Sequence, residues 1–211
     1  MMHRMGVAVA TLVWLATACA GLFVVWQHQT TPGPRAGEAP AEFPRDIPAA
    51  IGLTQQEGSP TVIMLAHPKC PCTRASIGEL HVLFTQLGGK ARGFVLFMSP
   101  KDAPEGWEKT DSWRRAEAIP GVTVLRDPDG QLAASFGATV SGHTVVYDEN
   151  GNLVFSGGIT SSRGHSGDNA GRSAIVQALD EAAHPRAWRY GVAMPTFGCG
   201  LRGAAREETK L

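Results

Sequence analysis

Two cysteines stand one residue apart in the segment Cys70-Pro71-Cys72. The apolar run Thr61–Ala66 before them predicts a buried strand, and the residues after them predict a helix. Open α/β sheets bind ligands at such a junction, where the partial positive charge of the helix N-terminus stabilises a thiolate. A disulfide across one intervening residue is strained and exchanges readily, so the pair is predicted to be redox-active. The open alternative is that two small thiols only pack beneath the helix.

Lys69 and Cys199 are auxiliary candidates. Lys69 directly precedes the pair, and its positive charge is expected to lower the pKa of a neighbouring thiol. Cys199 lies in the glycine-containing segment 195–201. In an oxidising compartment an extra thiol usually finds a partner, so we hypothesise that Cys199 folds back as a resolving or structural partner of Cys70 or Cys72. A mobile tail with an idle cysteine is the alternative.

His143 is the third auxiliary candidate, because it directly precedes a strand-like run. A histidine beside a cysteine pair can take a proton from a thiol or serve as a metal ligand with two thiolates. The alternative is a loop histidine that only hydrogen-bonds the backbone.

The elements that must position these residues alternate along the chain. Residues 149–152 carry an Asn-Gly turn between two strand-like runs, which predicts a hairpin. The pattern therefore predicts an α/β fold with a sheet of mixed direction flanked by helices. Strands are expected at 61–66, 93–98, 122–126, 144–148 and 153–157, and helices at 73–87, 107–118, 131–136 and 169–183.

This order of elements, with a cysteine pair at a helix start, resembles the thioredoxin-like superfamily. The stretches 127–137 and 144–151 look like those of membrane-anchored thiol-disulfide proteins of the bacterial cell envelope. The resemblance implies a thioredoxin-like sheet and thiol-disulfide exchange with protein thiols or disulfides, without a cofactor. Two departures are visible: Lys69 stands where the attacking cysteine of a Cys-x-x-Cys motif would be, and Ser141-Gly142-His143 replaces the usual cis-proline loop.

A second resemblance leads to a different function. The stretch 140–147 is similar to the histidine-bearing segment of Sco-type copper-delivery proteins. It implies a copper chaperone in which Cys70, Cys72 and His143 hold the metal, a donor set that suits copper. A third possibility is a binding module that keeps the thioredoxin-like fold without catalysis.

An uncharged apolar stretch, residues 5–26, has the length of about 20 residues that a transmembrane helix needs. His3 and Arg4 precede it, so we expect a cytoplasmic N-terminus and an extracytoplasmic domain. Lipidation at Cys19 is the alternative form of attachment. The expected organisation is a stub and transmembrane anchor at 1–26, a proline-rich linker at 27–45, a thioredoxin-like domain at 46–186 and a C-terminal extension at 187–211.

The charge of the chain argues against nucleic acid as a partner. Lysine and arginine total 19, as do aspartate and glutamate, and the basic residues form no run. A basic patch of the kind that binds polyanions is therefore not predicted.

Overall fold

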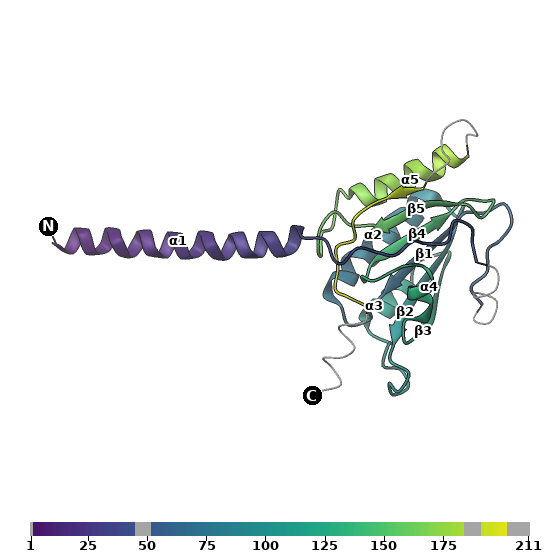
Figure 1. Ribbon diagram of the computed structural model, residues 1–211, viewed down its shortest axis with the longest axis horizontal. Helices are drawn as coiled ribbons and strands as arrows, with labels where there is room; N and C mark the ends of the chain where they lie inside the picture. The colour runs from purple at the N-terminus through teal and green to yellow at the C-terminus, as the bar shows by residue number, and fades with distance from the viewer. Residues whose placement is uncertain (1, 45–51, 184–190, 202–211) are drawn as a thin grey trace.

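A six-stranded mixed sheet forms the centre of the computed structural model, which describes residues 2–44, 52–183 and 191–201 (Figure 1). The strand order is β3-β2-β1-β4-β5-β6, with β1, β2 and β3 parallel, β4 antiparallel to both of its neighbours, and β6 parallel to β5. A parallel β1–helix–β2 unit followed by an antiparallel β4–β5 hairpin and a closing helix is thioredoxin-like, which confirms the predicted fold class. The strands are β1 Thr61–Ala66, β2 Arg92–Ser99, β3 Val122–Pro128, β4 His143–Tyr147, β5 Leu153–Gly158 and β6 Val192–Ala193.

Helices cover both faces of this sheet. One face packs against α2, α3 and α5, and the other against the short α4 and the buried Phe43 and Leu201. The helices are α1 Met2–Thr30, α2 Pro71–Leu87, α3 Asp111–Glu117, α4 Gln131–Ser135 and α5 Ala170–Ala182. The third helix is shorter than predicted, because hydrogen-bonded turns at Pro104–Trp107 and Gly106–Lys109 occupy the residues before it.

The junction between β1 and α2 places the cysteine pair. All six residues of β1 are buried, which fixes the end of the strand inside the domain. Pro71 then opens α2, where its missing N–H has no helical partner to lose. Cys70 is the N-cap residue, with extended backbone at φ −78° and ψ 123°. Cys72 consequently lies in the first helical turn, beside the unpaired backbone N–H groups of the helix start.

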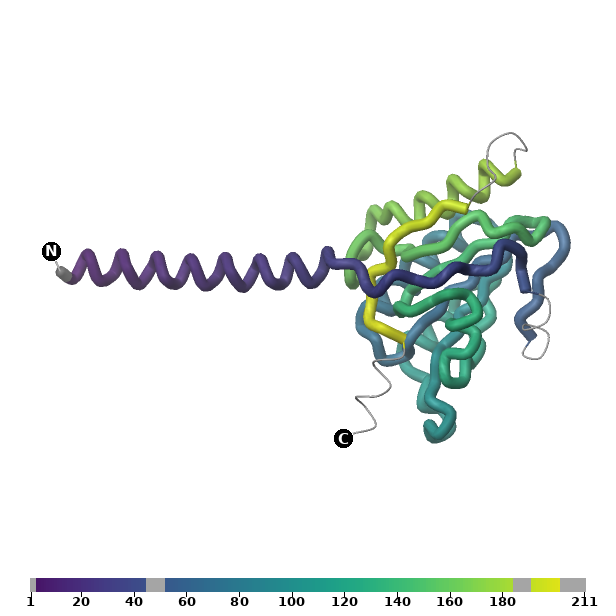
Figure 2. Tube along the Cα trace, in the orientation of Figure 1, coloured from purple at the N-terminus to yellow at the C-terminus, as the bar shows by residue number. Residues whose placement is uncertain are grey.

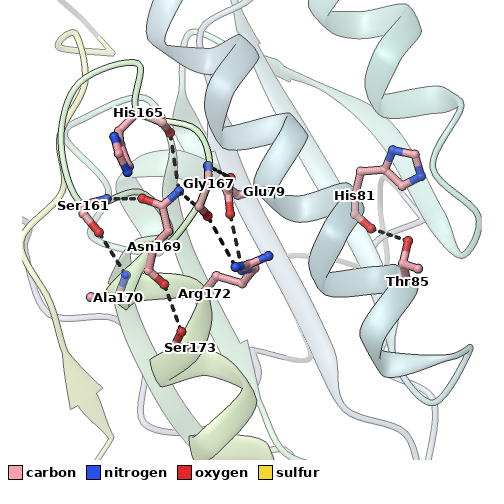
Figure 3. Close-up of polar contacts among 10 residues, drawn as sticks. All are labelled: Glu79, His81, Thr85, Ser161, His165, Gly167, Asn169, Ala170, Arg172 and Ser173. Carbon is pink, nitrogen blue, oxygen red and sulfur yellow. Dashed lines mark hydrogen bonds and ion pairs between the residues drawn. The ribbon is translucent and has the colours of Figure 1, made fainter.

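A loop between β5 and α5 ties the closing helix to α2 (Figure 3). The buried carboxylate of Glu79 in α2 accepts a hydrogen bond from the N–H of Gly167 at 3.0 Å and pairs with Arg172 of α5 at 3.3 Å. Asn169 is the N-cap of α5, and its side-chain oxygen accepts a hydrogen bond from the N–H of Ser161 at 2.7 Å. These contacts hold α2, and with it the cysteine pair, in place against the sheet.

The helix α1 projects from the domain and is exposed along the described part of its length (Figure 1). It has 29 residues, and it is long and apolar enough to cross a membrane. At a rise of about 1.5 Å per residue it exceeds the hydrocarbon thickness of about 30 Å. A signal sequence near an N-terminus has the same properties, so the helix is either a membrane anchor or a signal sequence.

The proline-rich segment after α1 lies along the domain. The helix itself runs on to Thr30, past the expected boundary at residue 26. Beyond it, the N–H of Gly37 donates to the carbonyl of Gly137 at 2.7 Å, and the Tyr147 hydroxyl donates to the carbonyl of Pro40 at 3.1 Å. Phe43 packs edge-on against the Tyr147 ring at 5.4 Å. Residues 31–44, which we call the N-terminal strap, are therefore part of the folded body. The expected boundaries at 45/46 and 186/187 lie outside the described residues.

Candidate functional site

Three sulfurs meet at the start of α2. The Sγ atoms of Cys70, Cys72 and Cys199 all lie within 4.8 Å of one another, and the three residues are free thiols. Two come from the N-terminus of α2, and the third comes from the C-terminal segment, residues 191–201. The structure thus brings together both predicted catalytic residues and the cysteine that was expected to fold back onto them.

Hydrogen bonds on both sides of Cys199 hold it in position. The carbonyl of Cys199 accepts a hydrogen bond from the N–H of Ser141 at 2.8 Å, and the N–H of Leu201 donates to Thr139 at 2.9 Å. Arg163 donates from its guanidinium to the carbonyl of Gly198. Gly198 has no room for a side chain, because a Cβ there would overlap the carbonyl oxygen of Ser141. Cys199 is therefore a fixed part of the site and not the tip of a loose tail.

Ser141 joins the segments around the cysteines. Its hydroxyl accepts a hydrogen bond from the N–H of His67 at 2.8 Å and lies 2.7 Å from the hydroxyl of Thr73. The Thr73 hydroxyl donates to the carbonyl of His67 at 3.0 Å, so Ser141 is the donor to Thr73. This buried network connects the end of β1, the first turn of α2 and the loop that contacts Cys199.

The loop before β4 takes a form other than a cis-proline turn. No cis peptide bond occurs among the residues that the structure describes. Gly142 adopts φ +89° and donates its N–H to the carbonyl of Leu65 at 2.8 Å. A Cβ at this position would lie 2.6 Å from the Ser76 hydroxyl, so glycine suits both the conformation and the space.

The hydrogen bonds among the sulfurs concentrate negative charge on Cys70. Hydrogen bonds from the thiols of Cys199 and then Cys72, with backbone N–H groups of Cys199 and Thr73, lower the pKa of Cys70 far below its ordinary value, against the opposing effect of burial. Hydrogen bonds with Cys199 and Cys70 raise the pKa of Cys72, and the hydrogen bond with Cys70 raises the pKa of Cys199 against the opposing effect of Cys72, with burial adding to both rises. One thiolate held by two protonated thiols is the arrangement that this geometry favours.

The sulfurs also differ in accessibility. Cys70 is only 4% exposed, whereas Cys72 and Cys199 are partly exposed. A partner therefore meets Cys72 and Cys199 first, and Cys70 lies behind them.

Lys69 lies beside the cluster in contact with an aromatic ring. Its ammonium group is 4.4 Å from the centre of the Trp107 ring, which also meets His67 edge-on at 5.7 Å. A cation over an indole face is held by the ring quadrupole. The effect of Lys69 on the thiols stays a prediction.

His143 is buried beneath the C-terminal segment and is not a member of the sulfur cluster. Its Nδ1 lies 3.0 Å from the Thr196 hydroxyl and its Nε2 lies 3.2 Å from the Ser156 hydroxyl. Burial lowers its pKa to about 4, so the ring is neutral at pH 7. Both ring nitrogens have partners, and the residue connects β4 to the segment that carries Cys199. Its predicted part in proton transfer or copper binding stays a prediction.

Sequence reasoning missed three residues that complete the site: Ser141, Arg163 and Thr196. Each contacts a residue more than fifty positions away in the chain. The glycines beside them, Gly142, Gly164 and Gly198, were the only local signal, since closely packed glycine loops often line functional sites.

Comparison with known proteins establishes the fold. No family model and no curated protein matches the chain. An uncharacterized conserved protein from Geobacillus kaustophilus is similar with a TM-score of 0.56 and 20% identity, over 80% of this chain and 92% of that chain. The hypothetical protein SMc02350 from Sinorhizobium meliloti 1021 is similar with a TM-score of 0.55 and 16% identity, over 82% and 97%.

A third structure, dsbF of MTB in mixed oxidized and reduced forms, has a TM-score of 0.43 and 14% identity over 59% of this chain and 81% of that chain. A similarity at that level carries no argument about activity. The chemistry therefore has to be argued from the site itself.

Proposed function

We propose that this thioredoxin-like chain is a membrane-anchored thiol-disulfide oxidoreductase whose reactive centre is the cluster of Cys70, Cys72 and Cys199. The observation that supports the proposal is the meeting of three free sulfurs within 4.8 Å at a helix N-terminus. A thiolate is stabilised there, and two further thiols stand within reach to resolve a mixed disulfide.

Exchange at this cluster proceeds in two displacements. A thiolate of the cluster attacks one sulfur of a partner disulfide, so that a new S–S bond forms and the other partner sulfur leaves and takes a proton. A second cluster thiol loses its proton and attacks the cluster sulfur of the mixed disulfide, so that the partner sulfur leaves and takes a proton. This closes an intramolecular disulfide and releases the partner as a dithiol. Two electrons pass to the partner, and the reverse sequence oxidises a partner dithiol.

The three cysteines take different parts in this scheme. Cys72 and Cys199 are the partly exposed sulfurs that meet the partner. Cys70 contacts both, and its lowered pKa favours it as the thiolate, so we assign it to the intramolecular disulfide with either Cys72 or Cys199 in preference to the third pair, Cys72–Cys199. Having two possible partners for one buried sulfur lets the site resolve a mixed disulfide at either exposed position.

The helix α1 is proposed as the anchor. It is exposed, apolar and long enough to span a bilayer, and His3 and Arg4 precede its apolar stretch. Positive residues favour the cytoplasmic side, which puts the domain on the extracytoplasmic side. Disulfide chemistry is sustained in such oxidising compartments, so the proposed location and the proposed reaction agree.

Exchange with oxidised glutathione tests the proposal. Full-length protein in detergent micelles is reduced, mixed with oxidised glutathione, and assayed for intramolecular disulfide by mass spectrometry. Cys70→Ser is expected to slow the formation of intramolecular disulfide at least tenfold, because only the Cys72–Cys199 pair, which lacks the sulfur that both hydrogen-bond, remains. Cys19→Ser, a matched loss of one thiol outside the cluster, is expected to leave the exchange unchanged. Equal behaviour of the two variants would count against the cluster as the reactive centre.

Copper(I) carriage is a second candidate, favoured by the same cluster. Soft thiolates select Cu(I), and three sulfurs at this spacing make a donor set without an imidazole. In this form of the copper hypothesis Cys199 takes the position that the sequence assigned to His143. Titration of Cu(I) against a competing chelator distinguishes the two donor sets. Cys199→Ser weakens copper binding if three thiolates hold the metal, and His143→Gln weakens it if two thiolates and the imidazole do. A chain that neither exchanges disulfides nor binds copper would be a non-catalytic binding module.

A further inference from the structure

We infer that the redox partner is itself a membrane protein whose disulfide or dithiol lies at the bilayer surface, because the sulfur cluster sits next to the end of α1. The inference rests on the proposed function and adds the class of partner. It is carried by contacts that connect the last turn of α1 to the residue before Cys199.

Arg163 makes the most direct of these contacts. Its Nε donates to the carbonyl of His28 in α1 at 3.1 Å, and the same guanidinium donates from Nη1 to the carbonyl of Gly198. Its backbone N–H donates to the carbonyl of Gln29 at 3.0 Å. Two hydrogen bonds from one planar group put the His28 and Gly198 carbonyl oxygens within roughly 8 Å of each other.

A second contact lies just beyond the helix. The N–H of Gly33 donates to the carbonyl of Thr196 at 2.9 Å. A Cβ on Gly33 would overlap the Val140 side chain, so the strap passes close to the loop that holds Cys199. Figure 2 shows the end of α1 and the yellow C-terminal segment side by side on the same face of the domain.

The position of the bilayer surface follows from the sequence of α1. The apolar stretch ends at Trp26, a residue type that prefers the membrane interface, and polar residues occupy the next four positions. His28 is two residues beyond Trp26, a rise of about 3 Å. Gly198 is therefore at most roughly 11 Å from the level of Trp26, which is no more than a few ångströms beyond a headgroup layer of about 5 to 8 Å. In the proposed anchored state the segment that carries Cys199 therefore lies near the membrane surface.

The height of the cluster above the bilayer decides which partner disulfides it can reach. A disulfide in the first few residues outside another protein's transmembrane span lies at the same height as the cluster. A disulfide at the far end of a large soluble domain lies well above the cluster. Residues 52–60, which lead into β1, lie on the side of the domain away from α1 (Figure 2). The length of β1, about 20 Å, separates that side from the cysteines.

Two transmembrane probe peptides test the inference. Full-length protein is reconstituted into phosphatidylcholine vesicles with a single-span peptide that carries a glutathionylated cysteine. The cysteine stands about three residues beyond the span in the near probe. In the far probe, a polyproline spacer of about 12 residues places it about 37 Å out. The near probe is expected to lose glutathione at least tenfold faster. Equal rates, or a faster far probe, would overturn the inference.

Soluble oxidised glutathione in the same vesicles separates this inference from the proposed function. If the cluster does not react with it, the proposed function fails and the inference falls with it. If the cluster reacts with it and does not prefer the near probe, only the inference fails.

Depth measurement gives an independent check that needs no turnover. A fluorophore on Cys199, with the other three cysteines changed to serine, is compared with a fluorophore on Glu57→Cys in a chain whose four native cysteines are serine. Lipids spin-labelled at the headgroup are expected to quench the Cys199 label several-fold more strongly. Equal quenching at both positions would contradict a membrane-facing site.

Discussion

Oxidation of the cluster is expected to join Cys70 to Cys199 in preference to Cys72. All three sulfurs lie within 4.8 Å of one another, so proximity alone does not choose between Cys72 and Cys199 as the partner of Cys70. A Cys70–Cys72 bond spans a single intervening residue, which forces the disulfide away from its preferred geometry. Cys199 approaches on a separate segment and brings no such constraint.

The two bonds differ in how much they stabilise the folded chain. A Cys70–Cys199 bond closes a loop of about 130 residues, for which the chain-entropy relation gives about 5 kcal/mol at 25 °C. A Cys70–Cys72 bond closes a loop of about three residues, for which the same relation gives about 2 kcal/mol before any strain is subtracted. With a urea m-value of about 2 kcal/mol/M, the difference of about 3 kcal/mol moves the unfolding midpoint by about 1.5 M.

Urea unfolding of the domain in full-length protein measures this difference. The midpoint is determined by near-ultraviolet circular dichroism for the oxidised and reduced forms of Cys72→Ser and Cys199→Ser, each in a Cys19→Ser background. Cys72→Ser is expected to keep a large gap between oxidised and reduced midpoints, and Cys199→Ser a small one. A large gap in Cys199→Ser, or none in Cys72→Ser, would refute the reasoning.

Three further predictions concern the residues around the cluster. His143 has its pKa lowered to about 4, so the unfolded chain binds the extra proton first and stability falls as pH drops from 6.5 to 4, by about 3 kcal/mol in all. His143→Gln should flatten that pH profile in urea unfolding. Glu79→Ala leaves the half-buried Arg172 without its carboxylate and should cost about 3 kcal/mol, whereas an unchanged midpoint would show that the pair contributes little. Ser141→Ala removes the acceptor for the buried N–H of His67 and should cost about 1 to 3 kcal/mol and speed alkylation of Cys199, which mass spectrometry follows.

The sequence could predict the fold because its core elements carry local signals. The strand Thr61–Ala66 was predicted with the bounds that it has, since all six residues are buried and Pro60 and Pro68 flank it. The helix at Asp111 was predicted too long, because its apolar spacing continues backward through Trp107 into residues that form turns. The two-residue β6 was missed, since its pairing depends on the edge of β5 and not on its own residues.

The site was predictable only in part, because local patterns are visible in the sequence and contacts between distant positions are not. The spacing of Cys70 and Cys72 before a helix is a local pattern, and it located the junction at which the three sulfurs meet. The fold-back of Cys199 was offered as one of two alternatives, because the bonds that decide it join positions far apart in the chain. The burial of His143 was not visible locally, because Thr196, 53 residues away, supplies one of its partners.

The N-terminal strap has a consequence for how this protein meets other molecules. A domain on a flexible linker takes many orientations and can meet partners throughout the space that the linker allows. Residues 31–44 are instead hydrogen-bonded along the domain and leave it little freedom relative to α1. In the proposed anchored state, encounters then come from lateral diffusion within the plane of the membrane. The exchange rate would follow the number of partners per unit area of bilayer, and overexpressing a soluble competitor would slow it far less than diluting the membrane with lipid.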